Sequence, residues 1–172
     1  MTDSLSAPAP RFYPHDSFPF AAELERHWQR IHEEYLNVQT ELVDWVERDL
    51  YGEGWQVFGL YDFPNGHAIA ANTARCPFTA QLIARCIPGH GACGFSRLLP
   101  GTRIQTHQGY QGPFLRCHLG LDVPPGDCTL QVDGETRHWA NGAALIFDDR
   151  LPHAAKNLTD RARVVLLVDF IP

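Results

Sequence analysis

The chain has 172 residues, which is enough for one domain with a sizeable core and short for two. Hydrophobic residues make up 44% and charged residues 20%, a balance that excludes a disordered or fibrous protein. The net charge of −6 argues against a nucleic-acid partner, because phosphate binding requires clustered Lys and Arg. No apolar run approaches the ~20 residues that a bilayer span requires. We therefore expect a single domain over residues 1–172, with neither a nucleic-acid nor a membrane partner.

Cysteine usage and the first residues indicate a reducing compartment. The five cysteines are odd in number and form no CxxC pair, which favours reduced thiols over a disulfide scaffold or a thiolate zinc site. The first residues include Asp3 where a signal peptide needs positive charge, and no apolar segment follows. We predict a soluble, cytoplasmic protein, and its oligomeric state is left open.

The first half of the chain predicts a loose arm followed by helices. Residues 1–16 are rich in Pro, Ser and Ala and are expected to lie along the surface. Apolar residues then recur every three or four positions, which predicts an amphipathic helical region over residues 18–51, broken once. We interpret residues 17–92 as a helical brace that contains one strand.

Two further elements complete this brace. The apolar run from Trp55 to Tyr61 predicts the strand. A second helix is expected over residues 76–87, because Pro77 suits a first helical turn and a Pro-Gly pair follows the segment.

From residue 93 onward the pattern changes to short β-rich runs separated by Pro-Gly, Asp-Gly and Asn-Gly turns. We expect strands near residues 94–99, 102–107, 114–122, 128–132, 143–148 and 163–170. Helices followed by at least six short strands predict a mainly β fold with flanking helices, a sandwich or jelly roll whose β core spans residues 93–172.

Two histidines are candidate metal ligands. His107 and His153 each lie at or just after the expected end of a strand, where a barrel mouth would hold the side chain. Imidazole suits iron, zinc and copper, so two histidines from separate strands can begin a metal site. A surface or core role for each histidine remains the alternative.

Two strands carry polar residues that the β-sandwich must accommodate. Strict alternation places Phe114, Arg116 and His118 on one face, whereas Cys117 points into packing. Arg163 begins a strand apolar enough to be buried on both faces, so its guanidinium needs an anionic partner. That partner is either a bound carboxylate or an Asp or Glu of the protein.

These segments together resemble the aspartyl/asparaginyl β-hydroxylase family of Fe(II)/2-oxoglutarate oxygenases. The resemblance is specific over residues 95–169 and weaker before them. It is carried, in order, by Phe95-Ser96, Pro100-Gly101-Thr102, His107-Gln108-Gly109, Leu115 to Leu121, Gly134 to Arg137, Leu145 to Asp149, His153, and Arg163 to Asp169.

The resemblance implies a double-stranded β-helix (cupin-like) that holds one Fe(II) through His107 and His153. Most 2-oxoglutarate oxygenases have a carboxylate ligand two positions after the first histidine, but Gly109 stands there. The family shares this departure and leaves the position to water, and Asp149 would hold that water by hydrogen bonding. A carboxylate introduced at position 109 is then expected to be tolerated better than loss of a histidine.

The same resemblance assigns the residues that bind the cosubstrate. Arg163 and Ser96 would hold the distal carboxylate of 2-oxoglutarate, Arg116 and His118 would help bind its iron-chelating end, and Trp55 would close the pocket.

Two substrate-side positions depart from the animal members. Phe114 stands where they carry an Arg, and Val57 where they carry a Gln. We therefore expect no strong preference for aspartyl carboxylates, unless Arg97 or Arg103 restores the charge.

The resulting prediction is a dioxygenase that uses Fe(II), 2-oxoglutarate and O2 to hydroxylate a small-molecule or peptide-like substrate, most simply at the β-carbon of an Asp or Asn unit. The first alternative is a halogenase or other oxidase with the same centre. The second is a non-catalytic jelly-roll protein that binds a carboxylate through Arg163.

Overall fold

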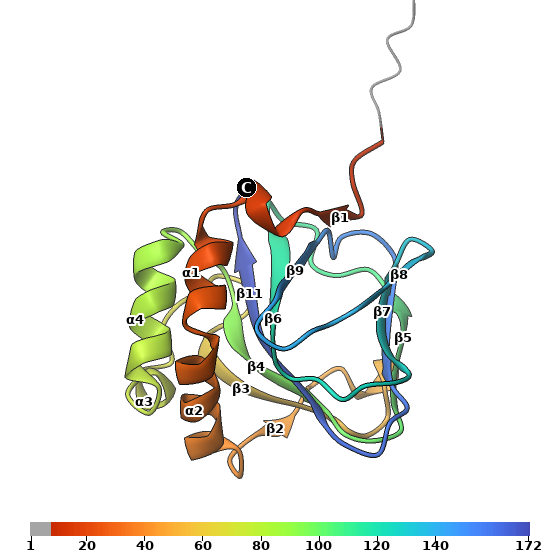
Figure 1. Cartoon of the computed structure of the whole chain (residues 1–172), viewed down its shortest axis with the longest axis horizontal. Helices are drawn as coiled ribbons and strands as arrows, with labels where there is room; N and C mark the ends of the chain where they lie inside the picture. Colours follow the sequence, from red (N-terminus) through yellow and green to blue (C-terminus); the bar gives the residue numbers. More distant parts are fainter. Residues whose placement is uncertain (1–7) are drawn as a thin grey trace, which may run out of the picture.

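The computed structural model describes residues 8–172, and two facing antiparallel sheets form its framework (Figure 1). The larger sheet has the strand order β1-β9-β6-β11-β4-β3-β2, and the smaller has the order β5-β10-β7-β8. The strands of the larger sheet are β1 (Phe12–Tyr13), β2 (Val43–Asp44), β3 (Trp55–Tyr61), β4 (Cys93–Leu98), β6 (Leu115–Asp122), β9 (Ala144–Phe147) and β11 (Arg163–Phe170). Those of the smaller sheet are β5 (Thr102–His107), β7 (Cys128–Val132), β8 (Glu135–His138) and β10 (His153–Asn157).

The path of the chain between the sheets defines a double-stranded β-helix. From β4 onward the chain passes to β5 in the small sheet, to β6 in the large one, to β7 and β8, back to β9, and then through β10 to β11. The central strands of the large sheet and the four of the small sheet thus make the eight-stranded jelly roll that the sequence predicted.

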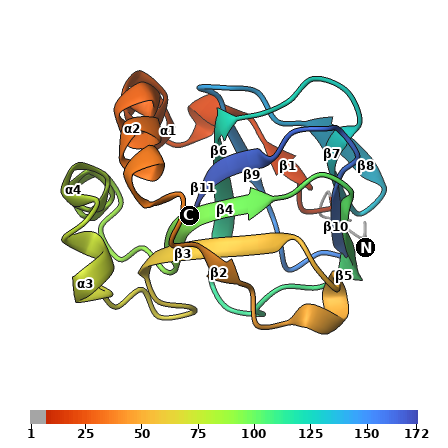
Figure 2. The same ribbon diagram turned by 90° about the horizontal axis from the view of Figure 1, so that it is seen from below.

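Helices cover only the outer face of the larger sheet (Figure 2). They are α1 (Phe20–Arg26), α2 (Trp28–Val38), α3 (Ala70–Thr73) and α4 (Pro77–Cys86), with short 3-10 turns at His15–Ser17 and Arg48–Leu50. Their apolar faces bury Leu24, Ile31 and Ile83 against Leu119 and Leu166 of the sheet. This core fixes the large sheet from behind, so the opposite face is free to build a site between the sheets. No helix in residues 8–172 is long and apolar enough to cross a membrane.

The predicted helix over residues 18–51 is wrong in its second half. It breaks once, at His27, as expected, but α2 ends at Val38. Leu42 then packs on the core from a turn, and Trp45 follows the edge strand β2, whose Val43 pairs with Val57. Their helical spacing is coincidental, since tertiary pairing with β3 overrides it.

Other differences concern weak sequence signals. Strands β8 and β10 were not expected, because Glu135–His138 and His153–Asn157 contain few β-branched or aromatic residues. The predicted arm over residues 1–16 lies partly outside the described residues, and its Phe12 and Tyr13 form β1 against β9. The strands predicted from residues 55, 102, 128 and 163 match the structure.

Candidate active site

Paired strands of the small sheet bring His107 and His153 together. His107 ends β5, as predicted from the sequence. His153 begins β10, whereas the sequence predicted a position after a strand end. The two residues are direct partners in the antiparallel register, and their ring centroids are 4.3 Å apart. Register therefore positions two imidazoles that are 46 residues apart in the sequence.

One nitrogen of each imidazole forms a hydrogen bond with a backbone carbonyl. His107 Nδ1 lies 2.8 Å from the carbonyl of Gln105, and His153 Nδ1 lies 2.9 Å from that of Leu151. A carbonyl only accepts, so Nδ1 carries the proton and Nε2 keeps its lone pair. Burial lowers the pKa of His153 to about 4, so this ring is neutral near pH 7. The residues present thus fit a divalent metal held by two imidazole nitrogens.

Gly109 and Asp149 occupy the place beside this pair. The backbone N–H of Gly109 donates to the Asp149 carbonyl at 2.8 Å, and a Cβ added at position 109 would collide with the Asp149 carboxylate. The described residues contain no cluster of three or more His, Cys, Asp or Glu side chains able to hold a metal. A side chain at position 109 would therefore require Asp149 to move, and the expectation that Gly109→Asp is milder than loss of a histidine stays a prediction.

Arg116 links Asp149 to a second buried carboxylate that sequence reasoning missed. Arg116 donates to both oxygens of Asp169, at 2.7 and 2.9 Å, and its Nη1 lies 3.3 Å from Asp149. Burial alone would lower the pKa of Arg116, but the two carboxylates raise it. Burial also raises the pKa of Asp149, with Arg116 opposing the shift. The signal for Asp169 was available: it is the only acidic residue in the last strand, which is apolar between Arg163 and Asp169.

An inner cavity lies between the sheets next to the two histidines, and β6 supplies two of its residues. Arg116 and His118 both line it, whereas Cys117 and Leu119 belong to the helix-side core. The predicted alternation along this strand is confirmed for these four residues.

Arg163 has no carboxylate partner in the described part of the chain. It is 2% exposed, donates through Nη2 to the Ser96 carbonyl and hydroxyl, and lies 4.5 Å from the Trp139 ring centroid. Its Nε is buried without a hydrogen-bond acceptor. Burial lowers the pKa of Arg163 to about 10, which still leaves it charged at neutral pH. An internal ion pair, one of the two alternatives, is thus absent among residues 8–172.

Apart from the two imidazoles, the other polar groups of the inner cavity also offer donors. Trp55 Nε1 and Arg163 both donate to Ser96 Oγ, which leaves the hydroxyl hydrogen free to donate. Trp139 Nε1 donates to His118 Nδ1 at 3.0 Å, so the proton of this ring is on Nε2, a buried atom without a partner. Burial, together with Arg163, lowers the pKa of His118 well below its usual range. A cavity lined by a cation and unpaired donors is suited to an anionic oxygen ligand.

A larger groove of about 600 Å³ opens outward from this cavity. The two share Trp55, Ser96, His107 and Arg116 at their junction. The predicted substrate residue Val57 lines the groove.

Phe114 does not line either cavity, contrary to expectation. It precedes β6, and its ring packs beside Gly91 and 6.5 Å from the ring of Tyr110. Arg97 is held elsewhere by Gln56 and Tyr35, so it does not supply the missing charge.

Comparison with known proteins identifies this architecture. A Pseudomonas putida prolyl-4-hydroxylase structure matches with a TM-score of 0.57 at 16% identity, covering 95% of this chain and 90% of that one. A Trichoplax adhaerens prolyl hydroxylase, solved in complex with a hypoxia inducible factor peptide fragment, matches with a TM-score of 0.55 at 15% identity, covering 85% and 78%. The fold is therefore the jelly roll that these two structures share.

Sequence comparison then places the chain more closely. The family model for aspartyl/asparaginyl beta-hydroxylase matches residues 25–172, and the chain belongs to this family of hydroxylases. An ornithine lipid ester-linked acyl 2-hydroxylase of Rhizobium tropici is 38% identical, with 94% of this chain and 60% of that protein covered. The human aspartate beta-hydroxylase domain-containing protein 2 is 38% identical over 68% of this chain and 36% of its own length. The chain thus spans less than two thirds of these relatives.

Proposed function

We propose that the protein is an Fe(II)- and 2-oxoglutarate-dependent dioxygenase that hydroxylates an amino-acid-derived substrate. The observation that carries this proposal is the pair of imidazoles next to a cavity that offers an unpaired arginine and further donors. Family membership and the prolyl hydroxylase fold support a hydroxylase in general. The metal and the cosubstrate are inferred from these residues.

In this proposal the two histidines hold the iron through Nε2. Their backbone hydrogen bonds fix the ring orientations before the metal binds, which lowers the cost of assembling the site. Asp149 would hold a water beside the metal. Its carboxylate occupies the space that a side chain at position 109 would need, and Gly109 has none. That same carboxylate disfavours chloride at this place, which argues against the halogenase alternative.

Arg163, Ser96 and His118 would hold 2-oxoglutarate at the inner cavity, which has a volume of about 30 Å³ and so takes one carboxylate end, while the rest of the molecule lies at the junction with the groove. Arg163 supplies the charge for the distal carboxylate, and the Ser96 hydroxyl and His118 Nε2 supply neutral donors. Two N–H groups of Arg116 donate to Asp169, and Nη1 forms an ion pair with Asp149, so N–H groups of Nη1 and Nη2 remain for the end near the metal. Trp55 closes the junction from the side of the groove.

With iron and 2-oxoglutarate bound, such a site uses O2 to convert R–H into R–OH, releasing succinate and CO2. The protein itself supplies no acid or base to the reacting carbon. It orients the reactants and excludes bulk water, since Arg163, His118 and His153 are all buried.

For the substrate, we propose that the reacting carbon bears a neutral or apolar group rather than an aspartyl carboxylate. The β-carbon of an asparaginyl unit satisfies this condition, and so does an aliphatic carbon. No free cation lines the groove in the described residues, because its one arginine, Arg116, is already paired. A relative that is named for hydroxylating a lipid acyl chain supports the same direction.

The test is product formation under ¹⁸O2. The enzyme is incubated with Fe(II), ascorbate, 2-oxoglutarate and a panel of aspartyl, asparaginyl and apolar amino-acid derivatives. We expect one labelled oxygen in the product hydroxyl and one in succinate, with neutral or apolar members at least as good as aspartyl ones. A product hydroxyl without label, a chlorinated product in chloride, or an aspartyl preference of a hundredfold would contradict the proposal.

A further inference from the structure

The outer groove is walled by aromatic rings from four separate segments. Trp55 lies at the inner end, and its ring centroid is 5.5 Å from that of Trp45. Trp45 is 5.9 Å from Phe63, which is 5.9 Å from Tyr110 at the rim. These rings form a continuous apolar wall from the junction with the inner cavity to the protein surface.

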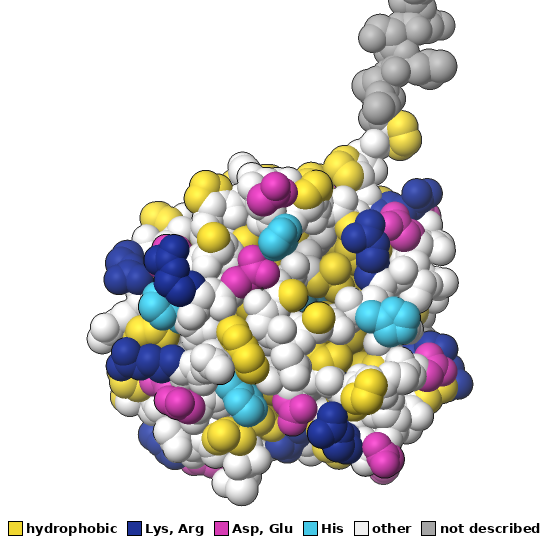
Figure 3. Space-filling model, in the orientation of Figure 1, with side chains coloured by type: hydrophobic (Ala, Val, Ile, Leu, Met, Phe, Trp, Pro, Cys, Tyr) yellow, Lys and Arg dark blue, Asp and Glu magenta, His cyan; other side chains and the backbone are white. Residues whose placement is uncertain are grey.

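Exposed apolar side chains gather at the mouth of this groove. Six large hydrophobic residues are exposed in the described chain, and three of them line this groove: Val43, Phe63 and Tyr110, with exposures of 64%, 45% and 46%. Elsewhere on the surface, charged and apolar side chains are interspersed, as on the face shown in Figure 3. A gathering of this kind marks a place where an apolar ligand leaves water.

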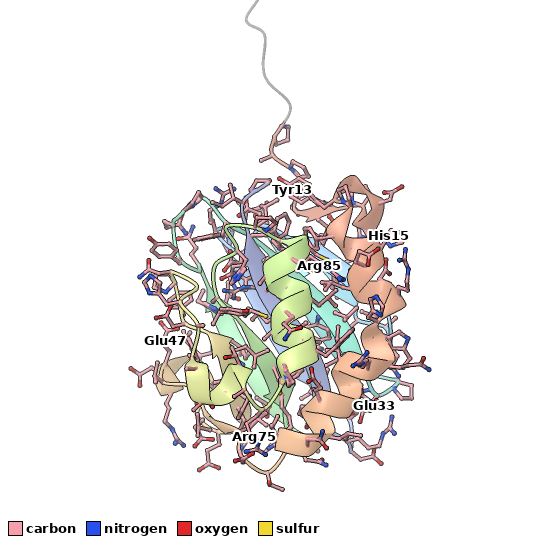
Figure 4. The ribbon with its side chains drawn as sticks, turned by 90° about the vertical axis from the view of Figure 1, so that its left-hand side faces the viewer. Tyr13, His15, Glu33, Glu47, Arg75 and Arg85 are labelled. Atoms are coloured by element: carbon pink, nitrogen blue, oxygen red, sulfur yellow. The ribbon has the colours of Figure 1, made fainter. Side chains whose placement is uncertain are left out.

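The charges around the groove limit what that ligand carries. Glu47, Asp62 and Asp149 line the groove, and Arg116, its single arginine, is ion-paired. Figure 4 shows Glu47 on the opposite side of the view from Glu33, which lies on α2. An anionic group would therefore meet carboxylates and no free cation, at a cost in affinity.

Few polar side chains in the groove are free to bind a peptide. The Asn72 amide donates to the Gly59 carbonyl at 2.8 Å, and Glu47 accepts from Trp45 Nε1 at 3.0 Å. Buried peptide groups without partners are costly, whereas an aliphatic chain needs none. The groove is thus better matched to a hydrocarbon chain than to an extended peptide.

We infer that the groove takes an aliphatic chain of an uncharged or cationic amphiphilic substrate and directs it towards the two histidines. This inference rests on the proposed function, because it names the substrate class of the same site. The chain lies along the wall of Trp45, Phe63 and Val57, and its outer part contacts the apolar rim.

The test measures binding without iron or 2-oxoglutarate. The full chain is titrated by calorimetry with N-acyl glycine amides whose acyl groups run from two to ten carbons, below their aggregation limits. We expect affinity to rise about fourfold for each added methylene, the factor that corresponds to about 0.8 kcal/mol per buried CH2. N-decanoyl glycine, which carries a carboxylate, is expected to bind at least tenfold more weakly than its amide.

Rim variants locate the binding site. Phe63→Ser and Val43→Ser should each weaken binding of the decanoyl amide at least tenfold. Ile171→Ser is the matched control, because Ile171 is 56% exposed but lies outside the groove, and it should change nothing. Affinity that is independent of chain length, equal loss in the control, or tighter binding of the carboxylate would overturn the inference.

The two proposals fail separately in this design. Chain-length-dependent binding by a protein that never forms succinate would overturn the proposed function alone. Succinate formation with short polar substrates and no chain-length dependence would overturn the inference and leave the dioxygenase proposal in place.

Discussion

The inner cavity and the outer groove meet at Trp55 but are built in opposite ways. The inner cavity presents a buried cation and unpaired donors, and the residues that line it all lie on strands of the two sheets. The groove presents aromatic rings from β3 and from loops, with carboxylates and no unpaired cation among the described residues. Under the proposed function, the strands of the framework thus carry the metal and cosubstrate site, and the peripheral segments carry the site that selects the substrate.

The two buried arginines show the same contrast on a smaller scale. Arg116 has two carboxylate partners within the protein, whereas Arg163 has none among the described residues. A buried cation without a partner is costly to keep unless a ligand supplies the charge. Arg116 is therefore neutralised within the protein, whereas under the proposed function Arg163 pairs with a bound anion.

The largest expected effect comes from removing either imidazole. His107→Ala or His153→Ala should abolish Fe(II)-dependent succinate formation, because one remaining nitrogen cannot hold the metal. The exposed His138 on β8 is the matched control, and His138→Ala should retain activity. Full turnover in either active-site variant would show that these rings hold no metal.

The next effect concerns the cosubstrate. Loss of one partner of a buried charge pair costs about 3–5 kcal/mol, so Arg163→Met should weaken 2-oxoglutarate binding at least a hundredfold. Titration calorimetry with Mn(II) in place of Fe(II) measures this directly. Arg97→Met, which removes an arginine bound to Gln56 and Tyr35, serves as the control. An unchanged affinity in Arg163→Met would place 2-oxoglutarate elsewhere.

The arginine comparison also predicts stability. Arg116→Met leaves Asp169 and Asp149 buried without their cation and should lower the free energy of unfolding by about 3–5 kcal/mol. Arg163→Met removes an unpaired charge and should change it by less than about 1 kcal/mol. Urea unfolding of the metal-free proteins gives both values. Equal losses would contradict the different assignments of the two residues.

A smaller effect is expected from pH. Burial lowers the pKa of His153 from 6.5 to about 4, so between these values the unfolded chain binds more protons than the folded one. Stability should therefore fall as the pH falls, by about 2 kcal/mol between pH 7 and pH 5 from this residue. Urea unfolding of the native protein and of His153→Gln at both pH values isolates the contribution of this histidine to the free energy of unfolding. A variant with the same pH dependence as the native protein would contradict this origin.

The sequence was sufficient to predict the jelly roll, because most of its strands show alternating polar and apolar residues and are separated by turn residues. The strand from Leu115 to Asp122 is the clearest case, since both its polar and its apolar faces were predicted and found. Strand β10 was missed, because the sheet imposes a β conformation that its own residues barely favour. Trp45 was predicted in a helix because it continues the three- and four-residue spacing of the apolar residues before it. In the structure, pairing with β3 places it after an edge strand instead.

Site residues on a single strand could be predicted from their charge and their alternation. Residues whose positions depend on loop conformation were harder to predict. Arg163 was singled out because a cation inside an apolar strand demands explanation. Phe114 was misplaced because it precedes β6, where strand alternation no longer applies. The aromatic wall of the groove could not be foreseen, since Trp45, Phe63 and Tyr110 come together only through loop geometry.

The most direct test of the central claim is succinate formation by the native protein. Purified enzyme receives 2-oxoglutarate, ascorbate and an N-acyl amino-acid amide, with and without Fe(II), beside the variants His153→Ala and Arg163→Met. We predict iron-dependent succinate in equal amount to the hydroxylated product, none from His153→Ala, and recovery of Arg163→Met only at much higher 2-oxoglutarate concentrations. Succinate that forms without iron, or at the native rate in His153→Ala, would contradict the assignment of this site as an iron- and 2-oxoglutarate-dependent hydroxylase.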